Sequence, residues 1–181
     1  LAFIGCDAGS TDGGPANLGG NKPFFSHGAI KRDLRILIKG ARQVGIPLMI
    51  GSCGGSGGDW NLNWVWEIVQ EIAREENLHF KTAVIESEPD RELLLQKYRE
   101  GKFRSLDPAP EIDEDTLRDT DHIVAMMGAE AYQEALVNGA QVILAGRSTD
   151  AAIFAAIPVA QGFPPGLCWH AAKIMECGGA A

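Results

Sequence analysis

Five short apolar runs alternate with longer segments whose apolar residues recur at helical spacing, and this alternation constrains the possible fold most strongly. The runs cover residues 2–6, 46–52, 80–87, 122–128 and 141–146. They have the length of strands, and most are nearly continuous in apolar residues, as in strands that are buried on both faces. Strands separated by helices indicate a parallel sheet with helices on both sides. The sequence therefore predicts an α/β fold, with a Rossmann-like, open and mainly parallel sheet covered by helices on both faces.

The segments between these runs carry the signals of helix ends. A helix is predicted over His27–Val44, because Ser26 can cap its N-terminus and Gly45 follows its end. Apolar spacing predicts a second helix from about Leu62. The remaining helices are expected over residues 90–100 and 131–137, after Asp150 and from about Leu167. Residues 102–119, with their prolines and acids, are expected to form a surface connection.

The 181 residues suffice for one domain with a sizeable core, and we predict a single α/β domain over residues 1–181. Because the sequence starts at Leu1 without a methionine and stops at "ECGGAA", we interpret it as the N-terminal part of a longer chain. No apolar run approaches the length of a membrane span, and the stretch "LAFIGCDAG" lacks the basic and long apolar regions of a signal peptide. The four cysteines form no CxxC pair, which favours reduced thiols and a cytoplasmic protein.

Electrostatics argue against a nucleic-acid partner. The formal net charge is -8, whereas a nucleic-acid binder needs a basic face. Lys31, Arg32 and Arg35 cluster on the predicted helix, but Asp33 lies among them. We interpret this cluster as an ordinary solvated face.

Ligands of open α/β sheets bind beyond the carboxyl ends of the strands, so the loops there are the candidate site. The first loop is "CDAGSTDGG", which places Asp7, Ser10, Thr11 and Asp12 among glycines. Its backbone N–H groups could hold an anion, and its carboxylates a proton or a cation. The alternative is a turn in which these side chains cap local amides.

The second loop is "GSCGGSGGDWN", in which Ser52, Gly54 and Gly55 precede a helix N-terminus. Glycines there let the backbone approach an anionic ligand closely. The loop is neither a GxGxxG fingerprint nor a Walker loop, so NAD and ATP are not indicated, while a phosphate or a carboxylate fits. Cys53 has no assignable histidine partner and is interpreted as an inert small side chain.

The third loop is "GRSTD", where Arg147, Ser148 and Asp150 follow the last buried run. Arginine is suited to bidentate contact with a carboxylate or phosphate. A buried strand end that carries a permanent charge needs an anion, and a ligand would be a natural one. Two structural alternatives remain open, namely a helix cap by Asp150 and an internal Arg147–Asp150 pair.

Two further features could reach this edge. In "WHAAKIMECGG", His170, Lys173 and Glu176 fall near one helical face, which by spacing allows a metal or acid–base cluster and equally a structural role. Glu86, at the end of the third run, is a candidate acid or base or a cap. His122 lies at the start of a predicted strand and hence at the opposite edge.

Together the motifs "GCDAGSTDGG", "GSCGGSGG", "GRSTD" and "ECGG" resemble those of the acyclic terpene utilisation AtuA family. The resemblance extends over essentially the whole chain, although the family often has an aromatic residue where this chain has Ser10 and Thr11. It implies a part in the catabolism of acyclic terpenes such as citronellol and geraniol, through branched acyl-CoA intermediates. Carried over from the family motifs are Asp12, Gly54, Gly55, Arg147, Asp150, Glu176 and Cys177.

The leading hypothesis is a catabolic enzyme that performs lyase- or hydratase-type acid–base chemistry on a small carboxylate or a branched acyl-CoA ester. The alternative is a non-catalytic metabolite-binding or accessory subunit of an acyl-CoA-processing complex. The cofactor stays open, with a divalent cation at the aspartates and CoA as part of the substrate as the candidates. The expected partners are a small anionic metabolite or acyl-CoA and a second copy, subunit or domain, with no nucleic acid and no membrane. The predicted catalytic residues are Asp7, Asp12, Asp150 and Glu176, and the predicted substrate-binding residues are Ser10, Thr11, Ser52, Gly54, Gly55, Arg147 and Ser148.

Overall fold

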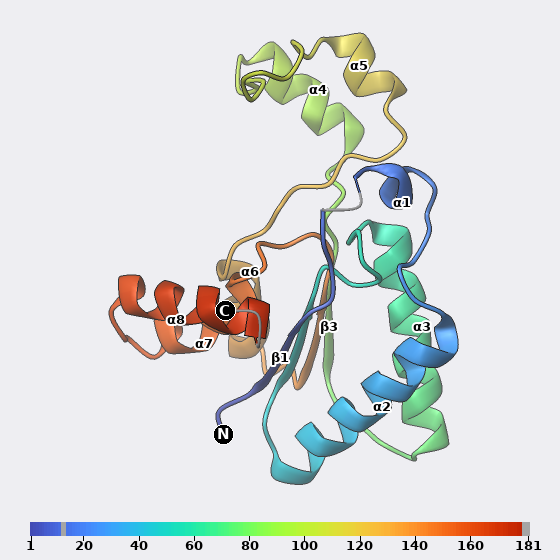
Figure 1. Cartoon of the computed structure of the whole chain (residues 1–181), viewed down its shortest axis with the longest axis vertical. Coiled ribbons are helices and arrows are strands. Elements are labelled where there is room, and N and C mark those ends of the chain that lie inside the picture. The colour runs from blue at the N-terminus through green and yellow to red at the C-terminus, as the bar shows by residue number, and fades with distance from the viewer. Residues whose placement is uncertain (12–13, 179–181) are drawn as a thin grey trace.

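The computed structural model describes residues 1–11 and 14–178, and its centre is a four-stranded sheet in which all strands run parallel (Figure 1). The spatial order is β1-β2-β4-β3. The strands are β1 (Ile4–Asp7), β2 (Leu48–Gly51), β3 (Thr82–Ile85) and β4 (Val142–Ala145). The predicted α/β class and parallel sheet are confirmed.

The helices are α1 (Ala16–Gly19), α2 (His27–Val44), α3 (Asp59–Glu75), α4 (Arg91–Arg99), α5 (Glu114–Asp119), α6 (Glu130–Val137), α7 (Ala152–Ala160) and α8 (Pro165–Cys177). The predicted ends of α2 are confirmed. The Ser26 hydroxyl accepts a hydrogen bond from the Ala29 N–H at 3.4 Å, and Gly45 has a left-handed φ of 71°. Within the described ranges, no helix combines the length and the apolarity that a bilayer crossing requires.

Helices cover the sheet on two faces, with α2 and α3 on one side and α6, α7 and α8 on the other (Figure 1). Successive strand residues point to opposite faces, so each strand supplies both cores. Ile50 and Leu144 pack in the core under α2 and α3, whereas Met49 and Ile143 pack in the core under α6 and α7. This double burial explains why the strand sequences are nearly continuous in apolar residues. Helices α4 and α5 pack against each other beyond the carboxyl ends of the strands (Figure 1).

The prediction of a strand over residues 122–128 is wrong. Only Met127 makes a bridge there, with Ser148, and Met126 is 56% exposed. The Ala125 N–H donates to the Ser87 carbonyl at 2.7 Å and the Met127 N–H to the Arg147 carbonyl at 3.0 Å. Because these acceptors lie beyond β3 and β4, the segment crosses the ends of the strands instead of joining the sheet.

Two further expectations change with this segment. His122 lies at the carboxyl edge of the sheet and not at the opposite one, because its Nδ1 is 2.9 Å from the Glu88 carboxylate. The predicted surface connection over residues 102–119 contains the short helix α5, which Asp113 caps through the Thr116 N–H at 2.7 Å.

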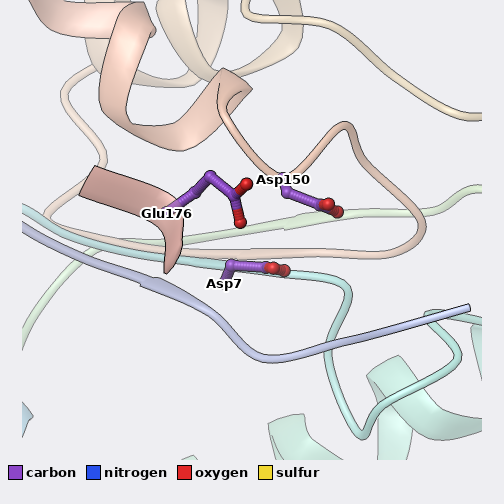
Figure 2. A group of neighbouring side chains, drawn as sticks. All are labelled: Asp7, Asp150 and Glu176. Carbon is purple, nitrogen blue, oxygen red and sulfur yellow. The ribbon is translucent and has the colours of Figure 1, made fainter. Parts of the chain in front are cut away.

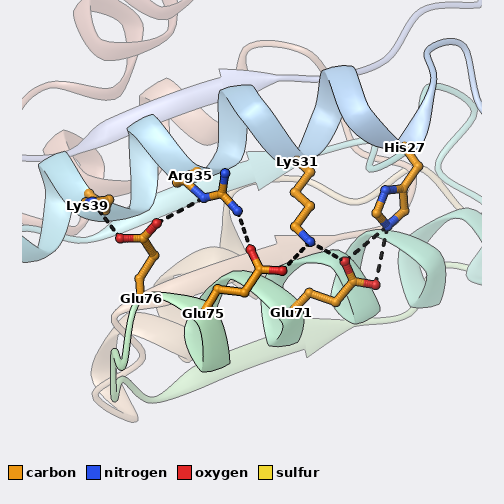
Figure 3. A network of polar contacts seen from close by, with 7 residues as sticks. All are labelled: His27, Lys31, Arg35, Lys39, Glu71, Glu75 and Glu76. Atoms are coloured by element: carbon orange, nitrogen blue, oxygen red, sulfur yellow. Dashed lines mark hydrogen bonds and ion pairs between the residues drawn. The ribbon is translucent and has the colours of Figure 1, made fainter.

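A chain of ion pairs joins α2 to α3 (Figure 3). Lys31 is 2.7 Å from both Glu71 and Glu75, and Lys39 is 2.6 Å from Glu76. Arg35 bridges Glu75 and Glu76. The basic residues recur every fourth position, so they share one face of α2. Lys31 and Arg35 of the basic cluster therefore pair with carboxylates of the same chain. This agrees with the interpretation of the cluster as an ordinary solvated face.

Replacing Lys31 with methionine should lower the thermal unfolding midpoint by at most about 3 °C, because exposed ion pairs contribute little to stability. Lys31 contacts two carboxylates of α3, so its removal interrupts the middle of the network. The difference from wild type should vanish in about 1 M NaCl, where charges are screened within a few ångströms. Lys102→Met, at an exposed lysine outside the network, is the matched control. A large loss that salt does not remove would contradict this account.

Candidate functional site

Three carboxylates from distant parts of the sequence meet at the carboxyl edge of the sheet (Figure 2). Asp7 is the last residue of β1, Asp150 lies in the loop after β4, and Glu176 lies near the end of α8. Each offers one oxygen, and these oxygens all lie within 4.8 Å of one another. Figure 2 shows the three carboxylates turned toward a common space. We call Asp7, Asp150 and Glu176 the carboxylate cluster.

β2, which lies between β1 and β4, ends at Gly51, a residue without a side chain. Asp7 is the register partner of Gly51. A Cβ on Gly51 would lie 2.8 Å from both the Ser148 hydroxyl and the Tyr132 hydroxyl and 2.5 Å from Ile153 Cδ1. The absence of a side chain at Gly51 therefore lets these three side chains pack over the end of β2 beside the cluster.

Arg147 lies beside the cluster and is almost completely buried, with 4% of its surface exposed. Its Nη2 is 3.3 Å from Asp150 Oδ1, which is the internal pair that the sequence left open. Its Nε and Nη1 are buried and have no hydrogen-bond partner among the described residues. Because burying polar nitrogens without acceptors is costly, a guanidinium in this state favours an additional anionic partner.

Asp7 holds its proton more tightly than an ordinary aspartate. Burial disfavours its charged form and, with the negative charge of Asp150, raises its pKa to about 6. The Gly9 N–H, 3.3 Å from Asp7 Oδ1, and the charge of Arg147 oppose this rise in pKa, and Glu176 adds to it. Asp7 therefore exchanges its proton near neutral pH, where a general acid or base is most effective.

An apolar cavity of about 380 Å³ adjoins the cluster and shares Asp7 with it. The volume is within the range of small-molecule sites. Ser10 and Gly54, two of the predicted substrate-binding residues, also line this cavity. Its apolar wall includes Phe24, Phe25, Ile30, Leu34, Leu37 and Val65. An acid–base group thus lies at the border of a space suited to a hydrocarbon chain.

A match to a known protein family covers most of these elements but not β1. The family described as acyclic terpene utilisation family protein AtuA matches residues 28–179, well over half of the 181 residues. The chain belongs to the AtuA family. This membership implies a role in acyclic terpene utilisation, and it confirms the resemblance read from the motifs. The matched range includes Arg147, Asp150 and Glu176 and begins after the first loop, so Asp7 is placed at the site by geometry alone. No curated protein and no solved structure matches the chain.

The other predicted residues of this AtuA-family chain lie around the cluster in different ways. The buried Ser52 hydroxyl accepts a hydrogen bond from the Ser148 N–H at 3.3 Å, which joins the loops after β2 and β4. Gly55 packs against the ring of Phe24, which a Cβ on Gly55 would overlap. Thr11 is exposed. Asp12 lies outside the described residues, so its predicted role stays a prediction.

Sequence reasoning did not single out Tyr132, although it predicted the helix that carries this residue. Tyr132 is fully buried, and its hydroxyl lies 2.8 Å from the Ser148 hydroxyl. Burial raises its pKa, so it stays a neutral phenol. Its nearest neighbours in α6 include Glu130, Gln133 and Glu134, so the local sequence does not mark Tyr132 as a core position. A tyrosine in such a stretch is a weak signal, because its hydroxyl needs a buried partner.

Three candidates do not join the cluster. Cys53 is fully buried and burial raises its pKa to about 12, in agreement with an inert thiol. His170 is exposed on α8, and Glu86 is exposed just past β3. Lys173 forms an ion pair with Glu176 one turn earlier on α8, and its side chain is 71% exposed. The predicted helical cluster is therefore reduced to Glu176 and its lysine.

Proposed function

We propose that this AtuA-family protein is a catabolic enzyme that acts on a small carboxylate or a branched acyl-CoA ester by lyase- or hydratase-type acid–base chemistry. One observation carries the proposal: Asp7 belongs both to the carboxylate cluster and to the wall of the apolar cavity. A substrate whose hydrocarbon chain occupied the cavity would bring its functional group to the cluster.

The cluster is suited to a reaction that needs an acid and a base together. Burial and the negative charge of Asp150 raise the pKa of Asp7 to about 6, so this carboxyl group can hold or release a proton near neutral pH beside two further carboxylates. One protonated carboxyl group can donate to a leaving hydroxyl while an ionised neighbour accepts a proton from the carbon next to a carbonyl. These two transfers remove water from a hydroxyacyl group, and their reversal adds water to a double bond.

Arg147 supports an anionic substrate group at this place. Its guanidinium is charged at any physiological pH, and its Nε and Nη1 lack acceptors among the described residues. A carboxylate, or the oxyanion that develops on a thioester carbonyl, is an acceptor of the right charge.

The glycines of the second loop lie against neighbouring parts of the protein. A Cβ on Gly57 would lie 2.6 Å from the Arg147 backbone nitrogen, and one on Gly54 would lie 2.8 Å from Asn61 Cβ. Together with Gly55 against Phe24, these glycines serve close packing within the protein. The glycines thus support the structure of the loop. In this proposal the carboxylate cluster and Arg147 bind the charged group of the substrate.

Filling the cavity should weaken binding of ligands that carry a branched chain. Ile30 lines the cavity from α2, so Ile30→Trp should raise the Kd for branched acyl-CoA esters or their free acids by at least about 10-fold. Loss of room for two methylene groups accounts for this factor. Binding is measured by calorimetry for a series of increasing chain length, with acetate and acetyl-CoA as short members that should be affected least.

Ile36→Trp is the matched control, because Ile36 lies on the same helix and is 66% exposed away from the core. It should bind the whole series like wild type. Equal effects of the two tryptophans, or a loss that does not depend on chain length, would argue against the cavity as the chain site. An accessory subunit would use the same cavity without chemistry, so turnover of a bound ligand separates the two functions.

A further inference from the structure

We propose that the carboxylate cluster binds a divalent cation and that Arg147 holds an anionic oxygen of the substrate next to this cation. The second part rests on the proposed function, whereas cation binding does not. The sequence motifs raised a divalent cation at the aspartates as a candidate but could not show which carboxylates meet, because the three come from distant parts of the chain.

The oxygens of the cluster have the spacing of ligands around one hard cation. One oxygen each from Asp7, Asp150 and Glu176 lies within 4.8 Å of the other two. Two Ca–O bonds of about 2.3–2.6 Å span this separation, whereas Mg–O bonds of about 2.0–2.1 Å would require the carboxylates to move slightly closer. An all-oxygen set selects cations such as Ca²⁺, Mg²⁺ and Mn²⁺ over those that prefer nitrogen or sulfur.

The state of Arg147 points independently to a ligand. Its side chain is 5% exposed, and only its Nη2 reaches a carboxylate, at 3.3 Å from Asp150. Its Nε and Nη1 are buried beside the cluster without acceptors among the described residues. A cation on the cluster would repel this guanidinium unless an anion lay between them. An anionic oxygen bound to the cation would supply the acceptor that these nitrogens need.

The charges at the site balance in this arrangement. When ionised, the three carboxylates exceed the positive charge of Arg147 by two negative charges. A divalent cation would balance these two charges, and an anionic substrate oxygen would face both the cation and Arg147. Lys173 presents no barrier, because its side chain is 71% exposed and can turn into solvent when Glu176 binds the cation.

A cation in this place would deepen the proposed chemistry. It would polarise a carbonyl or carboxylate oxygen and stabilise the negative charge that develops when a neighbouring carbon loses its proton. Arg147 would contribute from the other side of the same oxygen. The positive pair would thus recognise the substrate carboxylate or thioester, and the apolar cavity its chain.

Calorimetric titration of the chelator-treated protein with Mn²⁺, and separately with Ca²⁺, tests cation binding. We expect one saturable site in wild type, with affinity lowered at least about 10-fold in Asp150→Asn and in Glu176→Gln. Glu86→Gln is the matched control, because Glu86 is exposed at the same edge of the sheet and lies outside the cluster. Thermal melts of all variants establish that they are folded.

Isovalerate, a short branched carboxylate, probes the part of Arg147. It should raise the affinity for Mn²⁺ in wild type and not in Arg147→Met. Absence of this coupling in wild type would overturn the role of Arg147, and absence of saturable binding, or variants that bind like wild type, would overturn the cation site. Turnover without added cation and in the presence of chelator would leave the proposed function intact while the cation site failed. Cation binding without turnover of any carboxylate or acyl-CoA ester would leave the cation site intact while the proposed function failed.

Discussion

Replacing Asp7 with asparagine should lower turnover by about 10²- to 10⁴-fold, the usual cost of removing a group that transfers protons or holds the reacting centre. Asparagine has nearly the same size, so the cavity that Asp7 borders should keep its shape and its ligand. The expected result is a lower kcat with little change in ligand affinity. Steady-state kinetics beside calorimetry on a ligand that wild type converts would measure both.

Glu86→Gln serves as the control for Asp7→Asn, since it removes a carboxylate from the same edge outside the cluster and should keep normal turnover. If Asp7→Asn retained the turnover of wild type, the cluster would not be the reacting site. If no ligand were converted by wild type while the cavity still bound branched carboxylates, the accessory-subunit alternative would be favoured.

The same substitution should stabilise the protein above pH 6 when a chelator keeps it free of cations. Burial raises the pKa of Asp7 from an ordinary 3.8 to about 6, so the folded state binds this proton more tightly than the unfolded state. The stabilising contribution is therefore fully present below about pH 4 and is lost as the pH rises through about 6. The shift corresponds to at most about 3 kcal/mol, and solvent screening of this partly buried group reduces it to about 1 kcal/mol.

Asparagine does not ionise, so Asp7→Asn escapes this loss. Its advantage in the free energy of unfolding over wild type should be near zero at pH 4 and should reach about 1 kcal/mol at pH 8. Urea unfolding at both pH values, in the presence of chelator, would measure it. An equal difference at the two pH values would show that the burial of the carboxylate is not the cause.

Gly57→Ala should destabilise the fold by about 3 to 4 kcal/mol and lower the unfolding midpoint by roughly 10 °C. Gly57 has φ of 73°, and a Cβ there would lie 2.6 Å from the backbone nitrogen of Arg147 and 2.8 Å from its Cα. These are main-chain atoms at the end of β4, so no side-chain rotation relieves the overlap. The loop after β2 must move away from Arg147, and we expect the variant also to bind branched carboxylates more weakly.

Gly139→Ala separates the two causes of this loss. Gly139 has a similar φ of 79°, but a Cβ there would meet nothing within 4 Å. Its substitution should therefore cost only the left-handed backbone, about 1 kcal/mol. Comparable losses in the two alanine variants would show that the contact with Arg147 is not what makes Gly57 necessary.

The sequence was sufficient for the class of fold and for the edge of the sheet at which the site lies. Apolar runs between amphipathic segments predict a parallel sheet, because only strands buried on both faces need such runs. Asp7 is the last residue of β1 and Arg147 follows β4 closely, so their position at the carboxyl edge requires no further information. Ser26 and Gly45 bound α2 for equally local reasons.

Periodicity could not identify the segment over residues 122–128, which has the composition of a strand and lies across the ends of strands. Composition indicates whether a segment can be buried among apolar residues. A strand, however, exists only if neighbouring backbones accept its hydrogen bonds. Here the acceptors are Ser87 and Arg147, both beyond the sheet. Tyr132 was not singled out from the sequence for a similar reason, because its hydrogen-bond partner Ser148 lies in another element.

By itself the sequence determined which residues could carry charge at the functional edge, because strand ends and helix caps are set by neighbours along the chain. Only the tertiary structure decided which of them meet. The strand order β1-β2-β4-β3 sets β2 between Asp7 and Asp150, and α8 returns Glu176 to the same place. Gly51 then matters for the side chain that it lacks, since Tyr132, Ser148 and Ile153 occupy that space. Such convergence depends on contacts between segments that are far apart in the sequence, and no local pattern encodes them.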